Sequence, residues 1–159
     1  MPGVPRLDPA AAVDHVAARC QRGISRFLVF GVPAEKGLDR AVGSDAVVPR
    51  FLTGARERLG DTVTLIADVG LSPYTTDGHS VVMDSDGIDT AASYLAAGQL
   101  AVAFAAAGAD LVAPCLSLLL AAEHGGMDTA DLFDEYHAAV ERSGADFVIG
   151  YAGDQFLRR

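Results

Sequence analysis

Tryptophan is absent from this chain of 159 residues, aromatic residues make up only 7% of it, and lysine occurs once, as Lys36. Acidic residues outnumber Lys and Arg by 21 to 12, so the formal net charge is −9 at pH 7. A protein that binds nucleic acid needs a basic surface to neutralise the phosphates. The scarcity of positive charge therefore argues against a nucleic-acid partner.

Long apolar runs are also missing. The two longest, Leu95–Ala107 and Leu111–Ala122, are separated by a Gly-Ala-Asp segment, and neither reaches the roughly 20 residues that span a bilayer. The first residues carry no apolar signal core. Cys20 and Cys115 are too few and too far apart to suggest a disulfide framework. We therefore expect a cytoplasmic protein that does not contact a membrane.

The composition that remains is that of a globular protein. Apolar residues make up 50% of the chain and charged residues 21%, which is typical of a packed soluble domain. Because tryptophan is absent and other aromatics are few, Ala, Val and Leu must fill the core. The length suits one domain that occupies residues 1–159.

A pattern of helical stretch, glycine and short apolar run occurs four times along the chain. Glycine just past a helix supplies a left-handed cap, and apolar runs without strict polar alternation are typical of parallel strands covered on both faces. The alternation of helix and strand predicts an α/β fold. The four pairs are Ala10–Arg22 with Phe27–Gly31, Val47–Leu59 with Val63–Asp68, Ala91–Ala107 with Asp110–Pro114, and Thr129–Ser143 with Asp146–Tyr151.

Potentially reactive side chains stand where these predicted strands end. In parallel α/β folds, ligands bind at the carboxyl ends of the strands, so this edge is the expected site. Position alone is weak evidence that any one residue contacts a ligand, because some residue follows every strand whether or not a ligand binds there. The residues concerned are Glu35, Lys36, Asp68, Cys115 and Tyr151.

The segment Asp68–Ser80 reads Asp-Val-Gly-Leu-Ser-Pro-Tyr-Thr-Thr-Asp-Gly-His-Ser. It resembles the signature loop of the porphobilinogen synthase family, also called δ-aminolevulinic acid dehydratase. Further segments are similar to that family in the same order, so the resemblance covers nearly the whole chain. Met1–Leu7 resembles the stretch after the family's first strand, Phe30–Lys36 its second strand and following loop, Ala106–Pro114 its fourth strand, and Ser143–Ala152 its final strand.

The resemblance implies a (β/α)8 barrel that joins two 5-aminolevulinate molecules into a pyrrole through lysine Schiff bases. Here the first, fifth, sixth and seventh strand units are missing, and with them both segments that carry the family's substrate-binding lysines. The expected fold is thus four helix–strand units equivalent to part of a TIM barrel. Lys36 matches no catalytic lysine of the family and reads first as a solvated loop residue. If an imine forms, only Lys36 or the terminal amine can form it.

The metal site that the resemblance implies is also altered. Members of the zinc type place three cysteines in the signature loop, at positions that are Gly70, Ser72 and Ser80 here. Glycine and serine do not supply the thiolate, imidazole or carboxylate donors that zinc needs. Asp77 and His79 would form at most a partial site, and His79 reads rather as a turn or substrate-contacting residue. We therefore expect neither a metal nor a cofactor.

Several family residues remain as candidates. Asp68 matches the family's strand-end aspartate, and Tyr151 matches a tyrosine near the substrate carboxylate. With His79 they form the expected catalytic set, because together they supply acid/base groups and hydrogen-bond donors. Cys115 stands where the family carries a serine, and a buried inert thiol is the alternative reading for it. The expected substrate-binding residues are Tyr74, Thr75, Lys36 and Cys115.

Four strands do not close a barrel of this type, and an open sheet leaves two unpaired edges. Two copies can pair edge to edge into one eight-stranded barrel, or a single chain can form a small open sheet covered by helices. The apolar stretch Leu116–Ala122 favours subunit contact, so we expect a homodimer or a higher homo-oligomer. In a dimeric barrel the candidate residues of both copies would converge on one mouth.

Two functions fit these features. The first is a lyase-like or dehydratase-like enzyme, distinct from a genuine porphobilinogen synthase, that performs acid/base chemistry on a small amino- or keto-acid: dehydration, condensation or cyclisation. The second is a non-catalytic descendant that binds a small ligand or a partner protein. The loss of lysines and metal ligands is compatible with both. The regular periodicity argues against gene decay.

Overall fold

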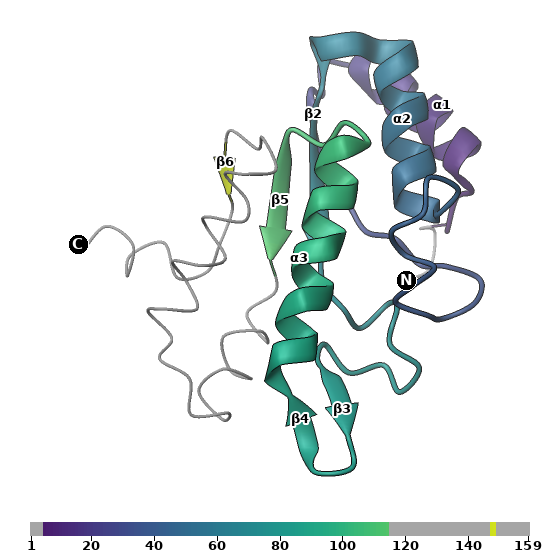
Figure 1. Cartoon of the computed structure of the whole chain (residues 1–159). Coiled ribbons are helices and arrows are strands. Elements are labelled where there is room, and N and C mark those ends of the chain that lie inside the picture. The colour runs from purple at the N-terminus through teal and green to yellow at the C-terminus, as the bar shows by residue number, and fades with distance from the viewer. Residues whose placement is uncertain (1–4, 115–146, 149–159) are drawn as a thin grey trace, which may run out of the picture.

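The computed structural model describes residues 5–114 and 147–148, which form a layer of helices packed on a parallel sheet (Figure 1). The sheet has four strands in the order β1-β2-β5-β6, and a separate antiparallel hairpin joins β3 to β4. In chain order the elements are α1 (Pro9–Cys20), β1 (Arg26–Val29), α2 (Val47–Leu59), the 3-10 turn η1 (Gly60–Thr62), β2 (Thr64–Val69), β3 (Val82–Asp84), β4 (Gly87–Asp89), α3 (Thr90–Ala106), β5 (Leu111–Pro114) and β6 (Phe147–Val148).

The helix boundaries follow from local chemistry. Asp8 begins α1 by accepting the amide of Ala11 at 3.0 Å, with Pro9 at the first helical position. Asp89 begins α3 in the same way by accepting the amide of Ala92 at 2.8 Å. After the helices, glycines with positive φ turn the chain toward the sheet, as the sequence predicted. These are Gly23, Gly60 and Gly108, with φ of 88°, 56° and 108°.

The strand register assigns each side chain to one of two faces. Leu28 pairs with Ile66, and Ile66 with Leu111, while Val29 pairs with Ala67 and Ala67 with Val112. Since successive side chains point to opposite faces, these rows lie on opposite sides of the sheet. The row that contains Ala67 and Val112 is buried, and the helices pack on it.

A single hydrophobic core lies between the helices and this buried face. In Figure 1, α3 runs in front of β2 and beside β5, and α1 and α2 lie together on its other side. The core combines valines of α1, the inward face of α2, alternate residues of β2 and the small side chains of α3. Its most enclosed members include Leu52, Ala55, Leu65, Ala67, Leu100, Phe104 and Val112.

The opposite side of the sheet, which we call the open face, carries an apolar row that belongs to no described core. Leu28 is 52% exposed, and Ile66 and Leu111 are only partly buried. The described helices all pack on the other side. The open face consists of the apolar residues Leu28, Ile66, Leu111 and Ala113 and the polar residues Arg26, Thr64 and Asp68.

A polar node joins α2 to the starts of two strands. Arg56 Nη2 donates to Gly108 O and to Asp110 Oδ2, both at 2.7 Å. Asp110 Oδ2 also accepts the amide of Leu65 at 2.7 Å. The Gly-Ala-Asp segment before β5 therefore supplies a carboxylate that links the end of α2, β2 and β5.

The expected parallel α/β fold is confirmed for the described residues, with the first three helix–strand units present. The predicted helix Thr129–Ser143 lies outside those residues, and β6 falls within the predicted strand Asp146–Tyr151. The β3–β4 hairpin was not predicted. In the described part of the chain, no helix combines the length and apolarity that a membrane crossing requires.

Candidate functional site

The candidate site is built around the segment that leaves the carboxyl end of β2. The alternation along β2 buries Leu65, Ala67 and Val69 in the core, so Asp68 lies on the open face. Asp68 Oδ2 accepts the amide of Gly70 at 3.2 Å. Burial raises the pKa of the Asp68 carboxyl above its ordinary value, and the hydrogen bond from Gly70 offsets only part of that rise. Asp68 is thus a carboxyl group that protonates more readily than a solvated one.

Tyr74 lies beneath this carboxyl in the core and is only 2% exposed. Burial, reinforced by the negative charge of Asp68, raises the pKa of Tyr74 to about 12. Its hydroxyl fits against Gly31, where an added Cβ would lie 2.7 Å from Tyr74 Oη. Within the described residues the hydroxyl has no hydrogen-bond partner. At neutral pH it is therefore a protonated donor in an apolar setting.

The next turn of the loop is fixed by its own hydrogen bonds. Thr75 is buried, and its Oγ1 donates to His79 O at 2.5 Å. The amide of His79 donates to Asp77 Oδ1 at 2.9 Å. That hydrogen bond is the main reason that the pKa of Asp77 is lowered. The backbone of His79 is thereby held in place while the residue itself remains exposed.

Lys36 joins this loop to the loop that follows β1. Its Nζ donates to Thr75 O at 2.8 Å and to Ser72 O at 3.1 Å. Next to it, the amide of Gly37 donates to Tyr74 O at 2.8 Å. Three contacts between the two loops therefore involve main-chain carbonyls, and the only lysine of the chain is a donor in two of them.

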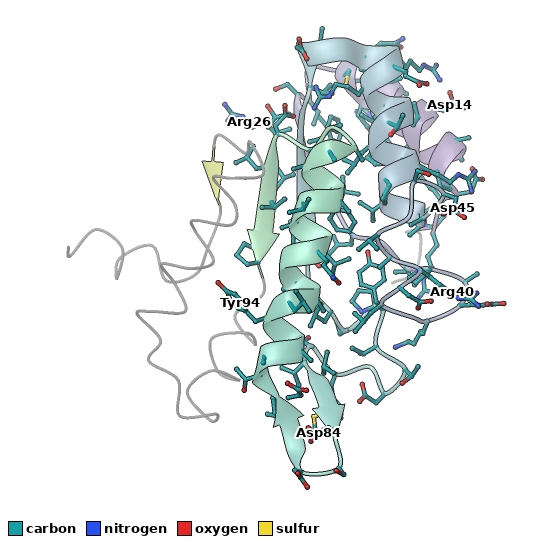
Figure 2. The ribbon with its side chains drawn as sticks, viewed as in Figure 1. Asp14, Arg26, Arg40, Asp45, Asp84 and Tyr94 are labelled. Atoms are coloured by element: carbon teal, nitrogen blue, oxygen red, sulfur yellow. The ribbon has the colours of Figure 1, made fainter. Side chains whose placement is uncertain are left out.

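A polar cleft of about 750 Å³ lies beside this arrangement, between the carboxyl end of β1 and the beginning of α2. Figure 2 shows Arg40 and Asp45 on the side of the molecule where the β1–α2 loop lies. Arg40 forms an ion pair with Glu35, and both side chains are exposed. The charged residues that line the cleft are Asp8, Glu35, Asp39, Arg40, Asp45 and Arg50.

The structure brings together some of the predicted site residues. Asp68 lies near the carboxyl end of β2, Tyr74 and Thr75 lie on the loop that follows it, and Lys36 lies on the loop after β1. His79 lies farther along the loop after β2. Cys115 and Tyr151 lie outside the described residues. Sequence reasoning did not single out Gly31, whose lack of a side chain admits Tyr74. Its only signal was its place in the Phe30–Lys36 resemblance.

The sequence predicted no metal centre, and the described side chains do not test that prediction. Among residues 5–114 and 147–148, no three His, Cys, Asp or Glu side chains gather in a way that could hold an ion. Asp77 and His79 supply two donors at most. The absence of a metal or cofactor stays a prediction.

Comparison with known proteins places this geometry in a family. The family model for delta-aminolevulinic acid dehydratase matches residues 1–119. The enzymes of that name from Mycobacterium leprae and Mycobacterium tuberculosis are 32% identical over 142 residues, which is 84% of this chain and 43% of theirs. The Halalkalibacterium halodurans protein is 35% identical over 131 residues, which is 78% of this chain and 38% of its own.

A solved structure agrees with these matches. Delta-aminolevulinic acid dehydratase (porphobilinogen synthase) of Toxoplasma gondii ME49, crystallised with its product porphobilinogen, superposes with a TM-score of 0.71 at 25% identity. The match covers 95% of this chain and 42% of that one. The sheet described above is thus equivalent to part of that enzyme's TIM barrel, and the chain spans about two fifths of the length of these relatives. The chain belongs to the delta-aminolevulinic acid dehydratase family.

Proposed function

We propose that this chain carries out acid/base chemistry on a small amino- or keto-acid, a dehydration, condensation or cyclisation, without a Schiff-base lysine or zinc. The observation that carries the proposal is the pair formed by Asp68 and Tyr74. Burial raises the pKa of both groups, and the charge of Asp68 contributes to the shift at Tyr74. Perturbed neighbouring groups at the carboxyl end of a barrel strand are typical of catalytic sites.

The two groups suit complementary roles. A carboxyl with a raised pKa exchanges protons at a pH closer to neutrality than a solvated aspartate does. In a dehydration, Asp68 would accept the proton from the carbon next to a carbonyl, and an acid such as His79 would protonate the departing hydroxyl, which leaves as water. Tyr74 would keep its proton and, packed against Gly31 in the core, would hold the loop that follows Asp68 in position. Tyr151 is proposed as a further acid/base group and Cys115 as a substrate contact.

Lys36 is proposed to position the loop and not to form an imine. Its ammonium group already donates to two carbonyl oxygens, whereas imine formation needs a free amine placed against a substrate carbonyl. Incubation with 5-aminolevulinate and borohydride, followed by mass spectrometry, tests this directly because the chain has one lysine. We expect no adduct on Lys36. An adduct there would show that covalent chemistry persists.

Turnover measurements test the acid/base proposal. Small amino- and keto-acids would be screened for loss of water or condensation with the full chain. Asp68→Asn should reduce kcat by about 100-fold or more, the usual contribution of a general acid or base. Asp84→Asn is the matched control, since Asp84 is an exposed carboxylate at the end of the β3–β4 hairpin. Unchanged turnover in Asp68→Asn would refute the assignment.

The alternative is a non-catalytic descendant that binds a small ligand or a partner protein. It is favoured by the engagement of Lys36, which leaves the described residues without a free lysine amine or a three-donor metal group. A binder would show ligand-induced thermal shifts and no turnover in either the parent or Asp68→Asn. An enzyme would show turnover that only the parent retains.

A further inference from the structure

The open face is the largest unexplained feature of the described structure. The helices pack on one side of the sheet, yet Leu28, Ile66 and Leu111 form an apolar row on the other. Just beyond the end of β1, Phe30 is 63% exposed. A contiguous apolar sheet face is normally covered by another layer. No described residue of the chain covers this face, so it calls for a covering partner.

A groove runs along the free edge of β1 next to this face. It has a volume of about 430 Å³, and six consecutive residues, 27–32, line it. Successive strand residues point to opposite faces. A groove that touches Phe27, Leu28 and Val29 in succession must therefore follow the edge of β1, where amides and carbonyls remain unpaired within the described sheet. Residues 5–7, α1 and the beginning of α2 form the other wall.

The topology indicates what fits this edge. All described sheet pairings are parallel, and the order β1-β2-β5-β6 leaves β1 and β6 as the two outer strands. A TIM barrel closes with eight parallel strands, and this chain matches 42% of a solved barrel of its family. Two copies of the four described strands, related by a two-fold axis along the barrel, would supply the required number. Each β6 would then pair with the β1 of the other copy.

We infer that the covering partner is a second copy of this chain, which closes the open face and the edge groove into one barrel shared by two subunits. The arrangement is independent of the proposed chemistry. Its consequence for the site is specific. In a ring of eight strands the two β2 strands lie opposite each other, so the two Asp68 side chains face each other across one mouth. The site is therefore incomplete in a single copy.

Solution mass and charged substitutions test this inference on the full chain. At about 50 µM, sedimentation equilibrium should give twice the 16.5 kDa chain mass, or an even multiple of it. Leu28→Glu places a charge on the open face and should weaken association by about 100-fold or more, because two uncompensated charges are buried in each assembly. Leu95→Glu is the control, since Leu95 is 63% exposed on α3, away from the sheet.

The outcomes separate the possible occupants. Dissociation by Leu28→Glu, with unchanged circular dichroism and with Leu95→Glu still associated, supports the shared barrel. A monomeric parent chain would overturn it and would mean that other residues of the same chain cover the face. An odd-numbered assembly, or one that only Leu95→Glu disrupts, would also overturn it. None of these results depends on turnover, so the proposed chemistry is tested separately.

Discussion

Tyr74 Oη occupies the space that a side chain at Gly31 would need, at 2.7 Å from the position of an added Cβ. The same Cβ would lie 2.3 Å from Val48 Cγ2. The segment after β1 and the loop after β2, which both resemble the family, can therefore pack together only because residue 31 is a glycine.

Gly31→Ala should destabilise the fold by about 1–3 kcal/mol, because overpacking a closed core forces its neighbours to move. Urea unfolding measures the change. Gly98→Ala is the control, since no atom lies within 4 Å of an added Cβ in the middle of α3. That substitution should be neutral or stabilise the helix. Equal effects of the two substitutions would contradict the packing account.

Lys36→Met should loosen the contact between the two loops while leaving the core intact. The substitution removes both hydrogen bonds from Nζ, with an expected loss of about 1 kcal/mol of stability. Hydrogen exchange should accelerate at the amide of Gly37, which is bonded to Tyr74 O. The amide of Leu65, bonded to Asp110, should stay protected and serves as the internal control. Unchanged exchange at Gly37 would show that Lys36 does not hold the loops.

Asp68 should give the protein a characteristic pH dependence. The folded-state pKa of Asp68 is raised above 3.8. Its contribution to folding stability is therefore fully present below pH 3.8 and is lost as pH rises through the folded pKa. Asp68→Asn should therefore be more stable than the parent at pH 7, with a smaller difference near pH 4. Unfolding free energies between pH 4 and 7 check the slope.

Asp77 provides the opposite case for comparison. Its folded-state pKa is lowered, so its contribution to folding stability is present above pH 3.8 and is lost as pH falls through the folded pKa. Asp77→Asn should be less stable than the parent at pH 7 and should converge with it in acid. Parallel pH slopes for the two variants would show that the assigned environments are wrong.

Tyr74 should limit stability in alkali. Its pKa is about 12 when folded and 10.0 otherwise, so the neutral phenol stabilises the fold below pH 10 and this contribution disappears through pH 12. The full effect is about 2–3 kcal/mol. Tyr74→Phe should lose less stability than the parent between pH 10 and 12. Absorbance titration should show that this variant lacks one late-ionising tyrosine.

The sequence predicted an element most accurately where its apolar pattern ends next to a glycine. The predicted helix Val47–Leu59 has the observed bounds of α2, and the strand starting at Val63 differs from β2 by one residue at each end. Gly60 follows α2 and Gly70 follows β2. Such glycines mark the end of an element in the sequence alone. The β3–β4 hairpin escaped notice because its strands have only three residues each and its surroundings are acidic.

The site was less predictable because its chemistry depends on tertiary packing. The loop after β2 was found from its resemblance to the family, but the burial that raises the pKa of Asp68 leaves no local signal. The bonds from Lys36 end on carbonyl oxygens, which every residue carries, so no side-chain pattern announces them. The fit of Tyr74 against Gly31 joins positions more than forty apart in the chain.

The shared carboxylate of Asp110 has a consequence for how the molecule opens. Because one side chain binds both Arg56 and the amide of Leu65, the end of α2 and the amino ends of β2 and β5 should unfold as one cooperative unit. The loop that carries Tyr74 and His79 leaves the other end of β2. That loop can therefore open without breaking the hydrogen bonds of Asp110 at the opposite end of the sheet.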